Sequence, residues 1–411
     1  MRRWYYGWSI LGVLAVTETL AYGMLIYAFS VFVVPLEAYF GWSRATINGA
    51  VSASQIVAGL LAWPVGIWLD RHGARWLMTF GAVWGAIWFG VWGFVTEPWQ
   101  HIAVWIMLGI SMATVLYEPA FVVVANWFHQ KRSHALTVLT FVAGFAIIIA
   151  TPTTEWLIRQ YGWQVTTWVF AIVMMLLLAP MLAIWLRHKP SDVGAFIDGT
   201  PSEPPRPQVA VTAAKVTEIV RDQGFWVLTV AFLFATASLV VILQTFVPYL
   251  IDRGYSAARA AQFAAIMGIL ALPSRLVFTP LGAIISRYTI ATILCVMQSI
   301  ALVALIIIPG EWGVWACVVL FGLSFGAITP ARAALFADRY GVLIYGAISG
   351  VLALVLTMAR AVVPLGVEIA RPLFGDYAPI YLVMGIVTTL GSLLILVVPR
   401  LGHNKTGTTQ M

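Results

Sequence analysis

The sequence predicts an all-α membrane protein with twelve transmembrane helices, and three observations support this prediction. Of the 411 residues, 61% are hydrophobic and only 9% are charged, whereas an ordinary soluble domain has about 25% charged residues. Apolar runs of about 20 residues, the length that crosses a bilayer, recur along the whole chain. Short polar loops separate these runs. The composition therefore excludes a soluble enzyme, a nucleic-acid-binding protein and a disordered scaffold.

Glycine, proline and clusters of charged residues mark the ends of the predicted helices. The first run is longer than the apolar core of a signal peptide and lacks a small-residue cleavage site, so we count it as a helix. In chain order the twelve predicted spans are residues 8–35, 45–69, 76–95, 101–126, 134–157, 164–186, 225–250, 259–285, 289–309, 313–336, 343–366 and 378–399.

The basic residues predict which ends of the helices face the cytoplasm. Sixteen Lys and Arg residues fall in the termini and loops of one side, and five fall in the loops of the other. Short loops rich in Lys and Arg stay in the cytoplasm. We therefore expect a multi-pass protein of a bacterial cell (inner or plasma) membrane with both termini inside, and the net charge of +7 then reports topology.

The segment 187–224 is the only long connection and holds five prolines. It predicts a cytoplasmic linker between an N-terminal six-helix bundle, residues 1–186, and a C-terminal six-helix bundle, residues 225–411. No loop is long enough to form a soluble domain, so the function must lie within the membrane bundle. Cys295 and Cys317 both fall in apolar runs and indicate neither a disulfide framework nor a metal site.

An internal repeat relates the two predicted bundles. Residues 35–43 (PLEAYFGWS) resemble residues 248–256 (PYLIDRGYS), with Pro, Gly and Ser matched at a constant offset of 213. Pro119 and Pro330 repeat at a similar offset of 211. Duplicated halves of this kind are typical of transporters that bind their substrate near the membrane midplane, between two halves related by an axis along the membrane normal.

The loop between the second and third spans carries a specific motif. It reads Gly66-Ile-Trp-Leu-Asp70-Arg71-His72-Gly73-Ala-Arg75 and resembles the signature of the major facilitator superfamily. The resemblance implies two pseudo-symmetric six-helix bundles, and it implies that Gly66, Asp70, Arg71, Gly73 and Arg75 form a cytoplasmic latch. Gly66 would allow close helix approach, Gly73 a tight turn, and Asp70 would face a helix N-terminus of the other half.

Further segments resemble a narrower branch, the monocarboxylate porters and oxalate/formate exchangers. They are Tyr6-Gly7-Trp8, residues 29–36, residues 40–44, and Trp127-Phe128 with Arg132 and Ala135. The resemblance implies that Arg275 in span 8 binds a substrate carboxylate and that Arg360 in span 11 supplies a second cation. Monocarboxylate porters place Asp one turn before the span-8 Arg; this chain has Ala271 there, so their proton-coupling scheme is not implied.

Four charged residues fall inside predicted spans: Glu18 and Glu118 in the first half, Arg275 and Arg360 in the second. Each costs about 2.5–3.5 kcal/mol or more to insert and is therefore a candidate functional residue. Guanidinium stays charged when desolvated and holds a carboxylate with two hydrogen bonds, so the arginines are predicted to bind substrate. Burial favours the protonated carboxyl, so the acids are predicted to couple protons or to gate. Structural pairing of these acids and bases remains an alternative.

Three polar side chains near these charges complete the predicted substrate site: Tyr22, Tyr117 and Gln244. The sequence contains no phosphate-binding loop and no His/Cys cluster with metal spacing. We therefore expect no cofactor, no metal and no enzymatic activity.

The resulting prediction is a secondary active transporter of a small organic anion, a monocarboxylate or a small dicarboxylate, that works by alternating access. Its expected partners are the carboxylate, the lipid bilayer, and protons in symport or a counter-anion in exchange; no nucleic acid is expected, and the protein is expected to be a monomer. The first alternative is an exporter of amphipathic compounds or drugs. The second is a non-transporting membrane sensor or scaffold.

Overall fold

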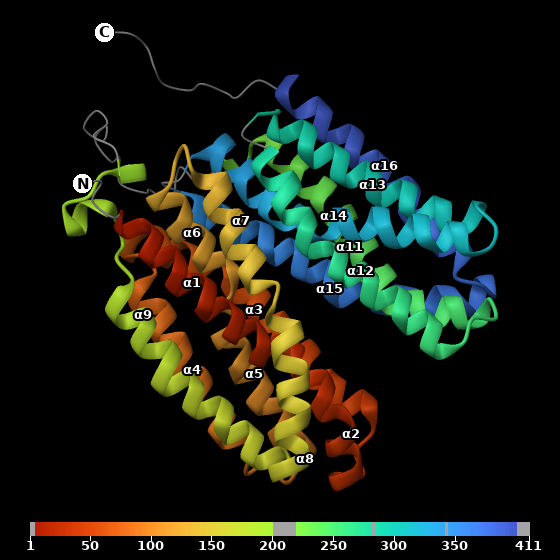
Figure 1. Cartoon of the computed structure of the whole chain (residues 1–411), viewed down its shortest axis with the longest axis horizontal. Helices are drawn as coiled ribbons and strands as arrows, with labels where there is room; N and C mark the ends of the chain where they lie inside the picture. Colours follow the sequence, from red (N-terminus) through yellow and green to blue (C-terminus); the bar gives the residue numbers. More distant parts are fainter. Residues whose placement is uncertain (1–4, 200–218, 282–283, 342–343, 401–411) are drawn as a thin grey trace. The chain divides into compact units, whose positions relative to one another are not determined.

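The computed structural model describes residues 5–199, 219–281, 284–341 and 344–400 (Figure 1). These residues form helices joined by short connections, and no strand occurs among them. Ten helices in this part of the chain are long and apolar enough to cross a membrane. One of the ten, Arg132–Trp185, contains two predicted spans divided at Gly162, where φ is +84°. With α4 for span 76–95, every predicted span corresponds to a helix, and the predicted all-α polytopic class is confirmed.

The chain divides into two compact units. Unit 1 contains Met1–Val211 and Phe336–Thr357, and unit 2 contains Thr212–Leu335 and Met358–Met411. The segment Phe336–Thr357 comes from the second half of the sequence, yet it belongs to unit 1. The division predicted from the sequence, with bundles at 1–186 and 225–411 and a linker at 187–224, stays a prediction; residues 200–218 of that linker lie outside the described part.

Unit 1 begins with α1, which runs into a π-helical turn and then α2. Figure 1 shows α4 and α9 of this unit side by side, and the two helices pack together. The elements of unit 1, besides its segment of α14 and α15, are α1 (Tyr6–Tyr22), the π turn Gly23–Tyr27, α2 (Phe29–Phe40), α3 (Arg44–His72), α4 (Arg75–Trp92), α5 (Pro98–Val115), α6 (Tyr117–Trp127), α7 (Arg132–Ala143), α8 (Ala146–Val173), a second π turn Met174–Leu178, α9 (Ala179–Trp185) and two 3-10 turns at Pro190–Val193 and Ile197–Gly199.

Local sequence signals set the helix ends of unit 1. The Ser43 hydroxyl accepts the N–H of Thr46 (3.1 Å) and caps α3. Gln100 accepts the N–H groups of Thr96 and Glu97 in front of α5, where Pro98 stands at a first-turn position that needs no donor. Gly73 ends α3 with a φ of +78°, a conformation that glycine adopts at no steric cost.

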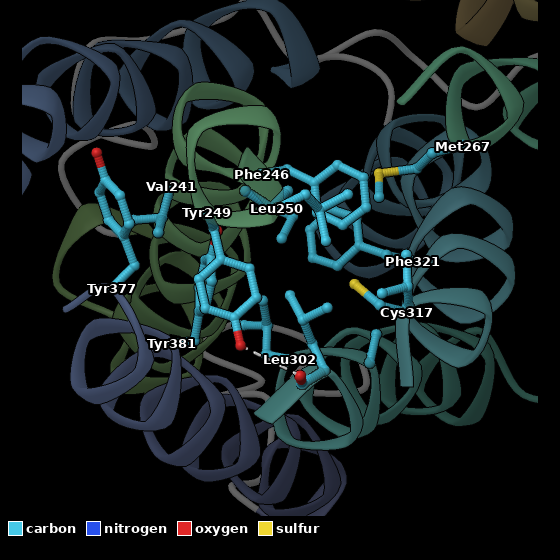
Figure 2. Close-up of a cluster of buried hydrophobic side chains, with 14 of the residues drawn as sticks. Val241, Phe246, Tyr249, Leu250, Met267, Leu302, Cys317, Phe321, Tyr377 and Tyr381 are labelled. Carbon is cyan, nitrogen blue, oxygen red and sulfur yellow. Dashed lines mark hydrogen bonds between the residues drawn. The ribbon is translucent and has the colours of Figure 1, made fainter. Parts of the chain in front are cut away.

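The helices of unit 2 are longer and more continuous. They are α11 (Gln223–Asp252), α12 (Ala257–Leu281), α13 (Arg287–Ile307), α14 (Glu311–Tyr340), α15 (Tyr345–Phe374) and α16 (Ala378–Val397), with the ends of α14 and α15 belonging to unit 1. Figure 2 shows a buried cluster in this unit that includes Phe246 and Tyr249 of α11, Phe321 of α14 and Tyr381 of α16. Thr245 donates to the carbonyl of Val241 and accepts the Tyr381 hydroxyl (2.7 Å), so this buried phenol is satisfied.

Two glycines allow α12 and α14 to approach closely. A Cβ on Gly326 would overlap the carbonyl oxygen of Ala271 and the hydroxyl of Ser274, and a Cβ on Gly322 would lie 2.6 Å from the carbonyl oxygen of Met267. The two glycines are four residues apart and therefore lie on one face of α14. Helices in lipid associate largely through such small residues, because the lipid chains are as apolar as the side chains.

We predict that Gly326→Ala destabilises the protein, by about 1–3 kcal/mol as is usual for overpacking, because the added methyl group meets backbone that cannot give way. The matched control is Gly268→Ala on α12, where an added Cβ meets nothing within 4 Å. Thermal unfolding of the purified variants in detergent measures the difference. Equal midpoints for the two variants would show that this close crossing does not matter for stability.

Candidate functional site

The two acids predicted in the first half lie close together in unit 1. Glu18 on α1 has 0% of its surface exposed, and neither of its carboxyl oxygens has a hydrogen-bond partner. Its carboxyl interacts electrostatically with that of Glu118 on α6. The structure therefore brings together two acids that are a hundred positions apart in the sequence, inside helices of membrane length.

Both helices are irregular at this place. A π-helical turn, Gly23–Tyr27, follows α1 one turn after Glu18, and such turns occur frequently at functional sites. The fourth span is interrupted at Leu116, whose φ and ψ are −85° and −169°. Pro119 explains the interruption, because its ring would clash with the carbonyl of the residue four positions earlier, which is Val115, the last residue of α5. Glu118 consequently lies in the first turn of a new helix, α6.

Two of the predicted substrate-binding residues lie beside the acids. The rings of Tyr22 and Tyr117 are 4.4 Å apart between centroids and tilted by 41°. Tyr117 also stacks on Phe121 at 5.1 Å. Tyr22 is four residues after Glu18 and therefore on the same face of α1, while Tyr117 adjoins Glu118. Four of the predicted site residues thus form one cluster in unit 1, Glu18, Tyr22, Tyr117 and Glu118, which we call the acid–tyrosine cluster.

The two predicted arginines belong to unit 2. Arg275 on α12 is half-buried, and its Nε donates to the carbonyl of Gly326 on α14 (3.0 Å) at the close crossing of these helices. Arg360 lies on α15 and is exposed. Sequence reasoning missed the glycines that position Arg275; their signal was the Gly322-x-x-x-Gly326 spacing in the tenth span.

Gln244, the third predicted substrate-binding side chain, is exposed on α11. The next residue, Thr245, takes the buried position and bonds Tyr381. The structure does not bring Gln244 to a cluster of polar groups, so its assignment stays a prediction.

The motif of the loop between α3 and α4 contacts the segment Phe336–Thr357. The carboxylate of Asp70 accepts the N–H groups of Gly346 and Ala347, both at 2.8 Å, in the first turn of α15. A Cβ on Gly66, one turn earlier, would overlap the carbonyl of Gly346. The N–H groups of Gly346 and Ala347 have no acceptor within α15, because they lie in its first turn. The Asp70 carboxylate accepts both of them and interacts favourably with the helix dipole.

The remaining motif residues have different surroundings. A Cβ on Gly73 would overlap the imidazole of His188, and Arg75 donates from Nε to the carbonyl of Ala183 on α9 (2.6 Å). Arg71 is exposed. Gly73 therefore packs against the segment that follows α9 and Arg75 bonds α9 itself, whereas Gly66 and Asp70, near the end of α3, contact α15.

An ion pair that the sequence did not reveal joins the start of α7 to the segment Phe336–Thr357. Arg132, with only 3% of its side chain exposed, bonds Asp338 of α14 (2.6 Å), and its Nε donates to the carbonyl of Phe128. Arg132 was one of the residues that resemble the narrower branch of the family. No neighbouring residue indicated that its partner lies 206 positions away in the sequence. We call the contacts of Gly66, Asp70 and Arg132 with residues 336–357 the junction.

No group of three or more His, Cys, Asp and Glu side chains that could hold a metal ion occurs in the part of the chain that the structure describes. The chemistry available there is that of single carboxyls, guanidinium groups and tyrosine hydroxyls, which bind ions and exchange protons.

A polytopic helical chain with charged side chains inside its membrane-length helices is typical of the class of membrane transporters. The chain belongs to the Major Facilitator Superfamily, whose family model matches residues 15–364. The Bacillus subtilis protein described as uncharacterized MFS-type transporter YcxA is 26% identical over 82% of this chain and 83% of its own length. Monocarboxylate transporter 13 of Rattus norvegicus is 23% identical over 96% of this chain and 89% of its own.

Solved structures share the fold. A variant of the E. coli fucose:proton symporter FucP matches 96% of this chain and 99% of its own with a TM-score of 0.73 and 10% identity. At that identity the likeness shows the fold alone. The family and these relatives are transporters, and the predicted family is confirmed.

His188 predicts a pH dependence of stability. Burial, then the charge of Lys189 and that of His72, hold the pKa of His188 below its usual value, while Asp192 acts in the opposite direction. As the pH falls below about 6.5, the unfolded chain takes up a proton that the folded protein resists, so the free energy of unfolding decreases. We expect the loss of thermal stability between pH 7.5 and 5.5 to be smaller in His188→Gln than in the unsubstituted protein. Parallel pH profiles would contradict this origin.

Proposed function

We propose that this protein is a secondary active transporter that carries a small organic anion across the cell membrane by alternating access. The observation that carries the proposal is Arg275. Arg275 lies in a membrane-length helix, and the backbone carbonyl of Gly326 orients its guanidinium through Nε. A fixed, positively charged plane of this kind suits a carboxylate, which guanidinium binds with two parallel hydrogen bonds.

Two further observations support an anion as the substrate. Arg360 supplies a second positive charge in unit 2, as a substrate with a second carboxylate or a flanking polar group would require. The name of the rat relative, monocarboxylate transporter 13, agrees with this class of substrate. The two intramembrane arginines argue against an exporter of amphipathic compounds, and the short predicted loops argue against a sensor or scaffold with a soluble signalling domain.

We further propose that proton symport, rather than anion exchange, drives transport. Glu18 supports this, because a fully buried carboxyl without a hydrogen-bond partner is stable only when it is neutral. The carboxyl of Glu118 acts on it electrostatically, and residues 137–150 of α7 and α8 contain no ionisable side chain. A carboxyl that must gain and lose one proton in each cycle fits these surroundings.

The proposal includes a location and an orientation. The protein would be a monomer in the cell membrane of a bacterium, with both termini and the junction on the cytoplasmic side, and would have no enzymatic activity. The two halves predicted from the sequence, residues 1–186 and 225–411, would be the parts that alternate, and residues 66–75 would form the latch.

We predict that substitution of Arg275 weakens substrate binding. Both Arg275→Lys and Arg275→Gln should raise the Km for uptake at least about tenfold, since loss of one partner from a desolvated charge pair costs about 2–5 kcal/mol. Lysine should not rescue, because it lacks the planar fork. The measurement is uptake of a panel of radiolabelled small carboxylates into proteoliposomes. Arg44→Gln, a substitution in an exposed ion pair with Glu37, is the matched control and should behave as the unsubstituted protein.

Two outcomes of that experiment would contradict the proposal. Anion uptake that ignores both a pH gradient and internal counter-anion would exclude a secondary transporter of this kind. An unchanged Km in both Arg275 variants would exclude Arg275 as the anion-binding group.

We predict that Glu18→Gln separates proton coupling from anion movement. Glutamine mimics the protonated carboxyl and cannot release a proton, so accumulation driven by a pH gradient should be lost. Exchange of labelled for unlabelled anion across the membrane, which needs no proton release, should persist. Glu37→Gln, an exposed glutamate outside the cluster, should keep both activities.

The two measurements distinguish the possible errors. Gradient-driven accumulation that survives Glu18→Gln would show that Glu18 does not carry the proton. An unsubstituted protein that exchanges anions but never accumulates them with a pH gradient would be an anion exchanger, and the proposed proton coupling would be wrong.

A further inference from the structure

Asp198 is the most unusual residue of the segment that follows α9. It lies in the 3-10 turn Ile197–Gly199, and its φ of +58° is the only positive φ of a non-glycine residue among those described. L-residues other than Asn and Asp rarely adopt this conformation. Only 6% of Asp198 is exposed, so its charge is directed into the protein rather than towards solvent.

The Asp198 carboxylate binds three consecutive backbone N–H groups of the loop between α6 and α7. It accepts from Gln130 at 2.7 Å, from His129 at 3.1 and 3.2 Å, and from Lys131 at 3.3 Å. Successive N–H groups that point to one place form an anion-binding concavity, and hydrogen bonds to a charged acceptor are about twice as strong as neutral ones. A residue of the predicted linker therefore fixes the backbone of a distant loop.

Aromatic side chains also stabilise the contact between the turn Ile197–Gly199 and the loop between α6 and α7. The Tyr5 hydroxyl donates to the carbonyl of Trp127 (2.7 Å), and the Tyr5 ring meets Phe128 edge to face. A Cβ on Gly199 would lie 2.9 Å from the Tyr5 ring. Burial, and next the charge of Asp198, raise the pKa of Tyr5, so Tyr5 stays a neutral hydroxyl that can donate.

The fixed loop carries one half of the junction. Arg132 directly follows the three bound N–H groups, and the carbonyl of Phe128, which accepts from Arg132 Nε, directly precedes them. Arg132 and the carbonyl that accepts from its Nε thus flank the stretch of backbone that Asp198 binds. The same segment also lies close to the other half of the junction, because His188 packs against Gly73, three residues after Asp70.

We propose that Asp198 is a positioning residue for the junction, and that residues 187–199 act as a brace that keeps the junction closed rather than as a spacer. The consequence for transport rests on the proposed function, since alternating access requires segment 336–357 to separate from Asp70 and Arg132. Loosening of the brace would favour that separation.

Hydrogen–deuterium exchange of the purified full-length protein without substrate tests the proposal. In Asp198→Asn one carboxylate oxygen becomes an NH2 group that faces backbone donors. Peptides covering residues 129–131 should exchange about tenfold faster, and peptides covering residues 338–347 should also exchange faster. Asp192→Asn is the matched control: it makes the same charge change in the same segment, but the Asp192 carboxylate accepts the N–H of Lys189 and acts on His188, both within its own segment, so both regions should stay protected.

A second pair of variants shows whether the effect passes through Arg132. In an Asp338→Asn background the ion pair is already lost, so adding Asp198→Asn should change exchange at 338–347 little further; the two substitutions should not be additive. Asp198→Gly, which relieves the backbone conformation but removes the carboxylate, should behave as Asp198→Asn and keeps the test available if the asparagine variant folds poorly.

Faster exchange confined to residues 129–131, or full additivity with Asp338→Asn, would overturn the positioning role. The measurement uses no substrate, so a failure of the proposed anion transport would leave its result intact, and the reverse also holds.

Discussion

The hydrocarbon of a membrane offers no hydrogen bonds to the backbone, and this constraint governs the rest of the structure. Backbone groups inside the spans must bond within their own helix or find a substitute. Departures from regular helix in unit 1, such as those at Gly23–Tyr27, Leu116 and Gly144, are therefore costly and need compensation. Thr19 provides one, because its hydroxyl reaches the carbonyl of Val142 just before Gly144. The first two departures flank the acid–tyrosine cluster. There, an irregular helix brings together side chains and backbone groups that a continuous helix would keep apart.

Close helix crossings at glycine also allow polar side chains to bond the backbone of a neighbouring helix. At both close crossings a polar side chain bonds backbone rather than another side chain. Asp70 lies one turn after Gly66 and bonds the first turn of α15, while Arg275 bonds the carbonyl of Gly326 itself. Because the backbones already touch, these side chains need little length to reach a partner, and the contact that packs the helices also fixes the direction of the charge.

The sequence predicted what depends on local pattern and missed what depends on tertiary contact. Apolar length predicted all twelve spans, and the motif located Gly66 and Asp70. Pro119 lies within predicted span 101–126, and α5 ends at Val115 because the proline ring would clash with the carbonyl four residues earlier. The junction partners Asp338 and Gly346 could not be predicted, since nothing local in residues 336–347 indicates a contact with residues 66–132. Gln244 and Thr245 were indistinguishable from periodicity alone, and the tertiary partner Tyr381 decides which of them is buried.

Differences in how each charge is supported suggest different tasks. The Asp198 and Asp70 carboxylates accept hydrogen bonds from backbone N–H groups, an arrangement that suits a structural contact. Glu18 has no such donors, so the proposed release of its proton requires another arrangement of the helices around it. The carbonyl of Gly326 orients Arg275 through Nε. The proposed carrier would use all three kinds of group: carboxylates bound by backbone to close it, a carboxyl that gains and loses a proton, and an oriented guanidinium to select what it carries.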